Sequence, residues 1–114
     1  MGKLTTHILD TARGCPGAGI AVRLYAADQE RRLIVSTESN DDGRCDAPLL
    51  DGAAFEIGSY ELEFDVAEYF SDLVGDDEAP FLDRVRLRFT MSRDEHYHVP
   101  LLVSPWSYST YRGS

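Results

Sequence analysis

Long apolar runs are missing from this sequence of 114 residues. No stretch approaches the roughly 20 apolar residues that a membrane-spanning helix needs, so we expect no membrane partner. Residues 1–7 also lack the basic segment followed by an apolar one that marks a secretory signal. We therefore expect a cytoplasmic protein.

Basic residues are scarce as well. Lys and Arg number 11 against 20 Asp and Glu, which gives a formal net charge of −9 at pH 7. Proteins bind nucleic acid through clustered Lys and Arg that neutralise phosphates, and an excess of negative charge repels such a ligand at long range. This balance excludes nucleic acid as an expected partner.

Low cysteine content and short length set two further limits. The chain has two cysteines, Cys15 and Cys45, and a cytosolic chain with so few more often keeps them as free thiols than as a disulfide. A chain of this length has room for one hydrophobic core, because two cores would leave each half too little apolar surface to bury. We expect a single domain, residues 1–114.

Two common catalytic signatures are absent. No serine lies in a Gly-x-Ser-x-Gly turn, so a serine-hydrolase triad is unsupported. His96 and His98 have a spacing that suits zinc, but no glutamate or cysteine stands at an obvious complementary spacing. We therefore expect no metal, while a metal on this histidine pair stays open as an alternative.

Alternating apolar and polar residues, by contrast, recur along the whole chain. This period of two is typical of strands with one face on a core and the other face outward. It predicts strands at 4–9, 19–25, 33–37, 60–66, 85–91, 96–103 and 106–111. Segments rich in Asn, Asp, Gly and Ser separate them, as expected for tight turns.

One segment has a different period. In residues 66–74 the apolar positions recur every three or four residues, with Asp65 placed as an N-cap and Gly75 at the end. This predicts one short helix among many short strands. The sequence thus favours an all-β fold, an antiparallel β-sandwich of two sheets with a single helix.

The two strands that contain histidines are the most informative for function. In residues 96–103, alternation places Tyr97 and Val99 on the core face and His98 on the opposite face. In residues 4–9 the same pattern turns His7 outward. A histidine alone is usually a solvated surface group, but two rigid strands that display imidazoles outward are suited to catalysis.

The chemistry of these side chains indicates a hydrolase. A pair of imidazoles can remove a proton from water near neutral pH and return it to a leaving nitrogen. Arg44 follows the predicted turn at Gly43, where its charged fork can hold an oxyanion. Cys45 beside it is either an activated thiolate or a buried structural cysteine, and we favour the latter.

Four segments in order resemble the 5-hydroxyisourate hydrolases, the enzyme branch of the transthyretin-like family. They are residues 4–10 (LTTHILD), 42–50 (DGRCDAPLL), 96–102 (HYHVPLL) and 104–114 (SPWSYSTYRGS). Residues 64–70 also fit, so the resemblance covers essentially the whole chain. Each segment alone is only weak evidence for the family, but the four together, in this order, form a specific match.

The resemblance implies a transthyretin-like two-sheet sandwich that forms a homotetramer, with active sites at subunit interfaces along a central channel. It implies hydrolysis of 5-hydroxyisourate, the product of urate oxidation, to 2-oxo-4-hydroxy-4-carboxy-5-ureidoimidazoline without a metal or organic cofactor. It also assigns residues by position. The catalytic residues would be His7, Arg44 and His98, and the substrate would be bound by Tyr111, Arg112, Gly113 and Ser114.

The resemblance leaves one rival function, because the transthyretin branch carries small hydrophobic molecules in its channel without catalysis. Carriers lack the terminal Tyr-Arg-Gly-Ser and the His-x-His-Val-Pro arrangement, and this chain has both. The sequence therefore favours the hydrolase. The roles of Cys15, Cys45 and His96 stay open.

Overall fold

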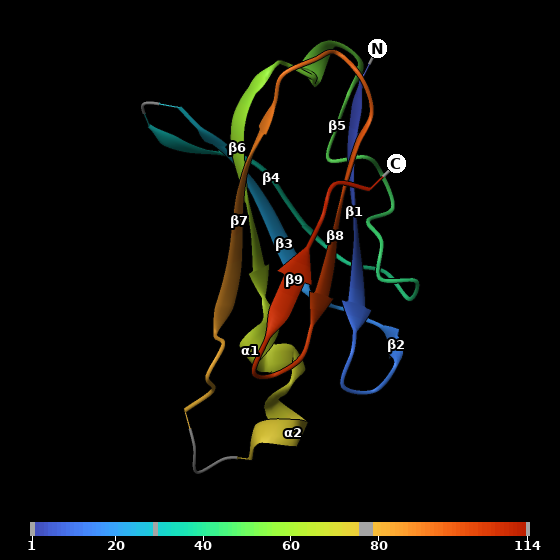
Figure 1. The fold of residues 1–114 in the computed structure, drawn as a ribbon, viewed down its shortest axis with the longest axis vertical. Helices are drawn as coiled ribbons and strands as arrows, with labels where there is room; N and C mark the ends of the chain where they lie inside the picture. The colour runs from blue at the N-terminus through green and yellow to red at the C-terminus, as the bar shows by residue number, and fades with distance from the viewer. Residues whose placement is uncertain (1, 29, 76–78, 114) are drawn as a thin grey trace.

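Two β-sheets face each other in the computed structural model, which describes residues 2–28, 30–75 and 79–113 (Figure 1). The first sheet has the order β2-β1-β8-β9, and β5 also pairs with β1. Its strands are β1 (Lys3–Asp10), β2 (Cys15–Pro16), β5 (Leu50–Asp51), β8 (Tyr97–Val103) and β9 (Tyr108–Thr110). The second sheet consists of β4 (Arg31–Glu38), β3 (Ala21–Ala27), β6 (Gly58–Asp65) and β7 (Arg84–Met91), in that order.

The predicted β-sandwich is confirmed, and the core lies between the two sheets. Alternation explains the layer that each side chain joins: Leu4 and Ile8 of β1 are fully buried, whereas the residues on either side of them are exposed or only partly buried. Most strand pairs are antiparallel. One pair, β1 with β8, runs parallel, with Thr5 opposite His98 and His7 opposite Pro100.

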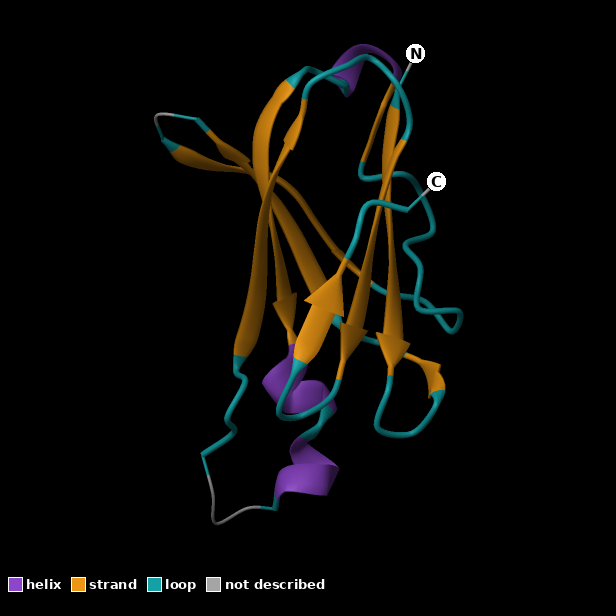
Figure 2. Ribbon diagram, viewed as in Figure 1, coloured by secondary structure: helices purple, strands orange, loops and turns teal. Residues whose placement is uncertain are grey.

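The two α-helical segments after β6 lie at one end of the sandwich, and a 3-10 turn lies at the opposite end (Figure 2). The α-helical segments are α1 (Val66–Tyr69) and α2 (Ser71–Val74), and the 3-10 turn, η1 (Gly52–Ala54), precedes β6. No helix among the described residues has the length and apolar character needed to cross a membrane.

The expectation of a single helix at 66–74 is therefore wrong, and Asp65 stands at the expected N-cap position without capping the helix through its side chain. Phe70 is buried in the core with a non-helical ψ of 11°, and it divides the segment in two. Asp65 makes no capping bond, because Arg23 and Arg84 engage its carboxylate. The backbone N–H of Val66 instead donates to the carbonyl of Asp83.

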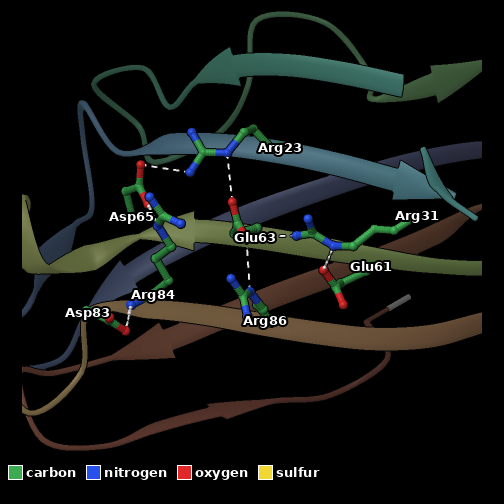
Figure 3. A network of polar contacts seen from close by, with 8 residues as sticks. All are labelled: Arg23, Arg31, Glu61, Glu63, Asp65, Asp83, Arg84 and Arg86. Atoms are coloured by element: carbon green, nitrogen blue, oxygen red, sulfur yellow. Dashed lines mark hydrogen bonds and ion pairs between the residues drawn. The ribbon is translucent and has the colours of Figure 1, made fainter. Parts of the chain in front are cut away.

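Paired charges cover the outer face of the second sheet (Figure 3). Glu63 of β6 accepts hydrogen bonds from Arg23, Arg31 and Arg86, with N···O distances of 2.8, 2.8 and 3.0 Å. Only 2 % of Glu63 is exposed. Burial on its own would raise the pKa of Glu63, but the three guanidinium groups outweigh burial and lower the pKa to about 2.

We expect Glu63→Gln to lower the free energy of unfolding by about 3 kcal/mol at pH 7, the free-energy equivalent of the pKa shift. The folded-state pKa lies below the ordinary value of 4.5, so this stabilisation is fully present above about pH 4.5 and is lost as pH falls through about 2. Urea unfolding at several pH values measures it. Glu61→Gln, which removes a more exposed partner of Arg31, should cost at most about 1 kcal/mol; equal losses in both variants would contradict the role given to Glu63.

Candidate active site

The outward face of the first sheet brings together side chains from three distant parts of the chain. Strands β1 and β8 lie side by side, so Thr5, His7 and His98 project from the same face. The ring centroids of His7 and His98 are 6.5 Å apart. Rigid neighbouring strands thus fix the two imidazoles that the sequence predicted to face outward.

The loop before Arg44 holds the His7 ring. The Nε2 atom of His7 lies 2.9 Å from the backbone carbonyl oxygen of Asp42. A carbonyl oxygen only accepts hydrogen bonds, so Nε2 carries the hydrogen when the ring is neutral. The lone pair of Nδ1 is then the one available to accept a proton.

Arg44 is held beside His7 by backbone geometry. Gly43 has a φ of 77°, and a Cβ atom there would lie 2.3 Å from the carbonyl oxygen of Ile8, so only glycine fits. The N–H of Ile8 donates to the carbonyl of Gly43 at 2.7 Å, and His7 and Arg44 form an isolated antiparallel bridge. The turn predicted at Gly43 therefore places Arg44 at the edge of the site.

The ring of His98 is enclosed on two sides. Its Nδ1 atom lies 2.8 Å from the hydroxyl oxygen of Thr5. The C-terminal segment turns back after β9, and the N–H of Gly113 donates to the carbonyl of His98 at 2.7 Å. A Cβ atom on Gly113 would lie 2.7 Å from Cδ2 of His98, so the glycine packs directly on the ring.

A cavity of about 320 Å³ opens at this point, and its lining residues are Thr5, Arg44, His96, Tyr97 and His98. Burial lowers the pKa of His98 below its ordinary value, and the positive charge of Arg44, together with the charge that His7 carries when protonated, lowers it further. His98 is therefore neutral over most of the physiological range. The site combines a neutral imidazole, a permanent cation and room for a small ring.

The remaining predicted residues lie elsewhere within the single chain. Arg112 donates to Glu95, and its guanidinium carbon stands 4.3 Å from the centre of the Tyr97 ring. Tyr111 is 59 % exposed and borders a groove between β7 and β9. Ser114 lies outside the described residues. Among the described terminal residues that were predicted to bind substrate, only Gly113 contacts a predicted catalytic residue, His98.

The sequence interpretation overlooked Thr5. Its place on β1, two residues before His7, was a usable signal, because alternation sets both on one face. The two cysteines are free thiols, as expected, with Cys15 exposed and Cys45 partly buried. Within residues 2–28, 30–75 and 79–113, no three His, Cys, Asp or Glu side chains cluster in a way that would hold a metal ion.

Comparison with known proteins gives a consistent result. A model of the HIUase/Transthyretin family matches residues 4–113. The 5-hydroxyisourate hydrolase of Pseudomonas aeruginosa is 55 % identical, with 100 % of this chain and 93 % of that protein covered. The mouse 5-hydroxyisourate hydrolase is 40 % identical, with 97 % of this chain and 94 % of that protein covered.

Solved structures agree on the fold. The crystal structure of an (S)-allantoin synthase superimposes with a TM-score of 0.91 and 46 % identity over 99 % of this chain, which spans 44 % of the length of that protein. Transthyretin from Sparus aurata gives a TM-score of 0.84 at 27 % identity, covering 97 % of this chain and 96 % of that one. Sequence identity to this transthyretin is lower than to the hydrolases of Pseudomonas aeruginosa and mouse.

Proposed function

This chain belongs to the HIUase/Transthyretin family, and from that premise we propose how it hydrolyses 5-hydroxyisourate in urate degradation. The identity of 55 % to a full-length hydrolase supports that activity over the carrier alternative. The observation that carries the mechanism is the convergence of His7, Arg44 and His98 on one face of the first sheet. These three residues perform the reaction.

The reaction begins with water held between the two imidazoles. His98, which is neutral and lines the cavity, removes a proton as the water oxygen attacks a carbonyl carbon of the ring, and His7 positions the water. Arg44 stabilises the negative charge that develops on the carbonyl oxygen. The carbon–nitrogen bond then breaks, and the imidazole pair returns the proton to the leaving nitrogen, which gives 2-oxo-4-hydroxy-4-carboxy-5-ureidoimidazoline. Tyr111, Arg112 and Gly113 wall the pocket in the assembled protein, and Ser114 is the fourth terminal residue proposed to bind the substrate.

The activity has a direct test. Urate oxidase generates 5-hydroxyisourate from urate in the cuvette, and the decay of its ultraviolet absorbance is followed with and without the protein. We expect a decay much faster than the spontaneous one, unchanged by a metal chelator. A decay rate that does not depend on the protein would overturn the proposed function, and loss of activity with chelator would restore the metal alternative at His96 and His98.

We expect activity to persist below pH 6.5. The mechanism needs a neutral His98, and the pKa of His98 is lowered from its ordinary value of 6.5. Activity is therefore present above the lowered pKa and is lost as pH falls through it. The pH profile of kcat/KM reports this group in the free enzyme, and an acidic limb centred above pH 6.5 would contradict the assignment.

We also propose that four copies assemble into a tetramer with active sites at subunit interfaces. Strands β7 and β9 are sheet edges, which readily pair with another chain. Near them, Trp106, Tyr108 and Tyr111 are 63, 45 and 59 % exposed, which is unusual for large aromatic side chains. Sedimentation equilibrium should give four times the chain mass of 12.8 kDa; a fully active monomer would refute the shared site.

Two further assignments complete the proposal. Residues 1–114 act as one hydrolase domain, supported by a hydrophobic cluster that draws on both sheets. The protein works in the cytoplasm, where the free thiols of Cys15 and Cys45 would stay reduced. Fractionation of the source cells tests the compartment.

A further inference from the structure

We infer that Thr5 is a positioning residue for His98: its hydroxyl holds Nδ1, so that Nε2 is the ring nitrogen left to face the cavity. The inference deepens the proposed function and rests on it. No role for Thr5 follows from the family resemblance or from the residues predicted to react.

The geometry around His98 leaves a single free edge of the ring. Thr5 lies directly opposite His98 in the parallel β1–β8 pair, and its Oγ1 atom is 2.8 Å from Nδ1. Gly113 packs against the Cδ2 side. Both contacts come from backbone-fixed positions, so the ring has little freedom to rotate. The edge that remains carries Nε2, and His98 lines the same cavity as Thr5 and Arg44.

A hydroxyl is an unusual choice of partner for a reactive imidazole, and it has a chemical consequence. Threonine both donates and accepts hydrogen bonds, so Thr5 remains bonded to Nδ1 whichever neutral tautomer His98 adopts. By contrast, Asp42 offers a carbonyl oxygen to His7, which fixes one tautomer. The Thr5 hydroxyl also carries no charge, so it orients the ring without the strong stabilisation of the imidazolium that a carboxylate would give.

Threonine also favours strands through its branched Cβ atom, which gives a purely structural alternative. Two substitutions separate the explanations. Thr5→Val keeps the branched shape and removes the hydroxyl, whereas Thr5→Ser keeps the hydroxyl and removes the methyl group. A positioning role predicts that serine preserves function and valine does not; a packing role predicts the reverse.

The test combines kinetics with nitrogen NMR. We expect Thr5→Val to lower kcat/KM for 5-hydroxyisourate by about 10- to 100-fold, the range seen when an outer partner of a functional imidazole is lost, with the change mainly in kcat. Thr5→Ser should stay within about threefold of the unsubstituted protein. With selectively ¹⁵N-labelled histidine, the chain gives signals from only three imidazoles, and the Nδ1 shift of His98 should move in Thr5→Val. The pKa of His98 should fall in that variant, because imidazolium loses a hydrogen-bond acceptor.

Thr11→Val is the matched control, since it removes a comparable hydroxyl contact, 3.1 Å from the carbonyl oxygen of Val103 at the far end of the β1–β8 pair. It should leave both the kinetics and the His98 signals unchanged. The inference is overturned if Thr5→Val retains full activity and an unshifted Nδ1 signal, or if Thr5→Ser is as impaired as Thr5→Val. The NMR measurement uses the free protein, so it stands even if 5-hydroxyisourate proves not to be the substrate.

Discussion

Replacing His98 by asparagine lowers kcat/KM for 5-hydroxyisourate by about 10² to 10⁴, the contribution typical of a general acid–base group. Asparagine retains an amide that can bond to Thr5, so the strand and the cavity wall should persist. It cannot accept and release a proton near neutral pH. The rate of absorbance decay with 5-hydroxyisourate generated in place from urate measures the loss.

His96→Asn provides a comparison at the same cavity. His96 is exposed and precedes strand β8, so the strand does not hold its ring as it holds His98. We expect its replacement to cost no more than a few-fold. Equal losses at both positions would point to a paired role, such as metal binding, and would contradict the mechanism proposed for His98.

Arg44→Ala should lower kcat by about 10² to 10³, the effect of removing one group that stabilises an oxyanion. The fold should be retained, because Arg44 is exposed and its turn is held by backbone bonds around Gly43. The pKa of His98 should also rise, since one of the positive charges that lowers it is gone. The acidic limb of the pH profile would then move to higher pH, which would be independent evidence that Arg44 lies close to His98.

Two further variants show whether the loss in Arg44→Ala comes from the charge or the shape of Arg44, and whether it is specific to this position. Arg44→Lys keeps the charge but loses the planar fork, and we expect activity between those of the alanine variant and the unsubstituted protein. Arg32→Ala removes an exposed arginine from β4 of the other sheet and should leave the rate unchanged. Full activity in Arg44→Ala would remove this residue from the mechanism.

Much of the fold was predictable because alternation is a local signal. In β8, apolar residues at every second position were sufficient to assign both the strand and the face of His98. Strands β2 and β5, with two residues each, are too short to show a period and were missed. The helix prediction at 66–74 did not anticipate that Asp65 would bind arginines from neighbouring strands, because such contacts are long-range.

In the candidate site, too, local features were predictable from the sequence and long-range contacts were not. Outward-facing histidines followed from the period of two, but no spacing in the sequence indicates that β1 lies beside β8. The family resemblance supplied the grouping of His7, Arg44 and His98, and their proximity is visible only in three dimensions. Thr5 escaped notice because a threonine in a strand is unremarkable until its partner on another strand is known.

The parallel pairing of β1 with β8 also bears on how the protein folds. Thr5 and His98 are 93 residues apart in sequence, so joining these strands closes almost the whole chain into one loop. The conformational entropy of that loop is lost before the contacts between the two strands can stabilise the fold. The hairpins of the other sheet need only local closure. During refolding, catalytic competence should therefore emerge last, in step with the slowest kinetic phase.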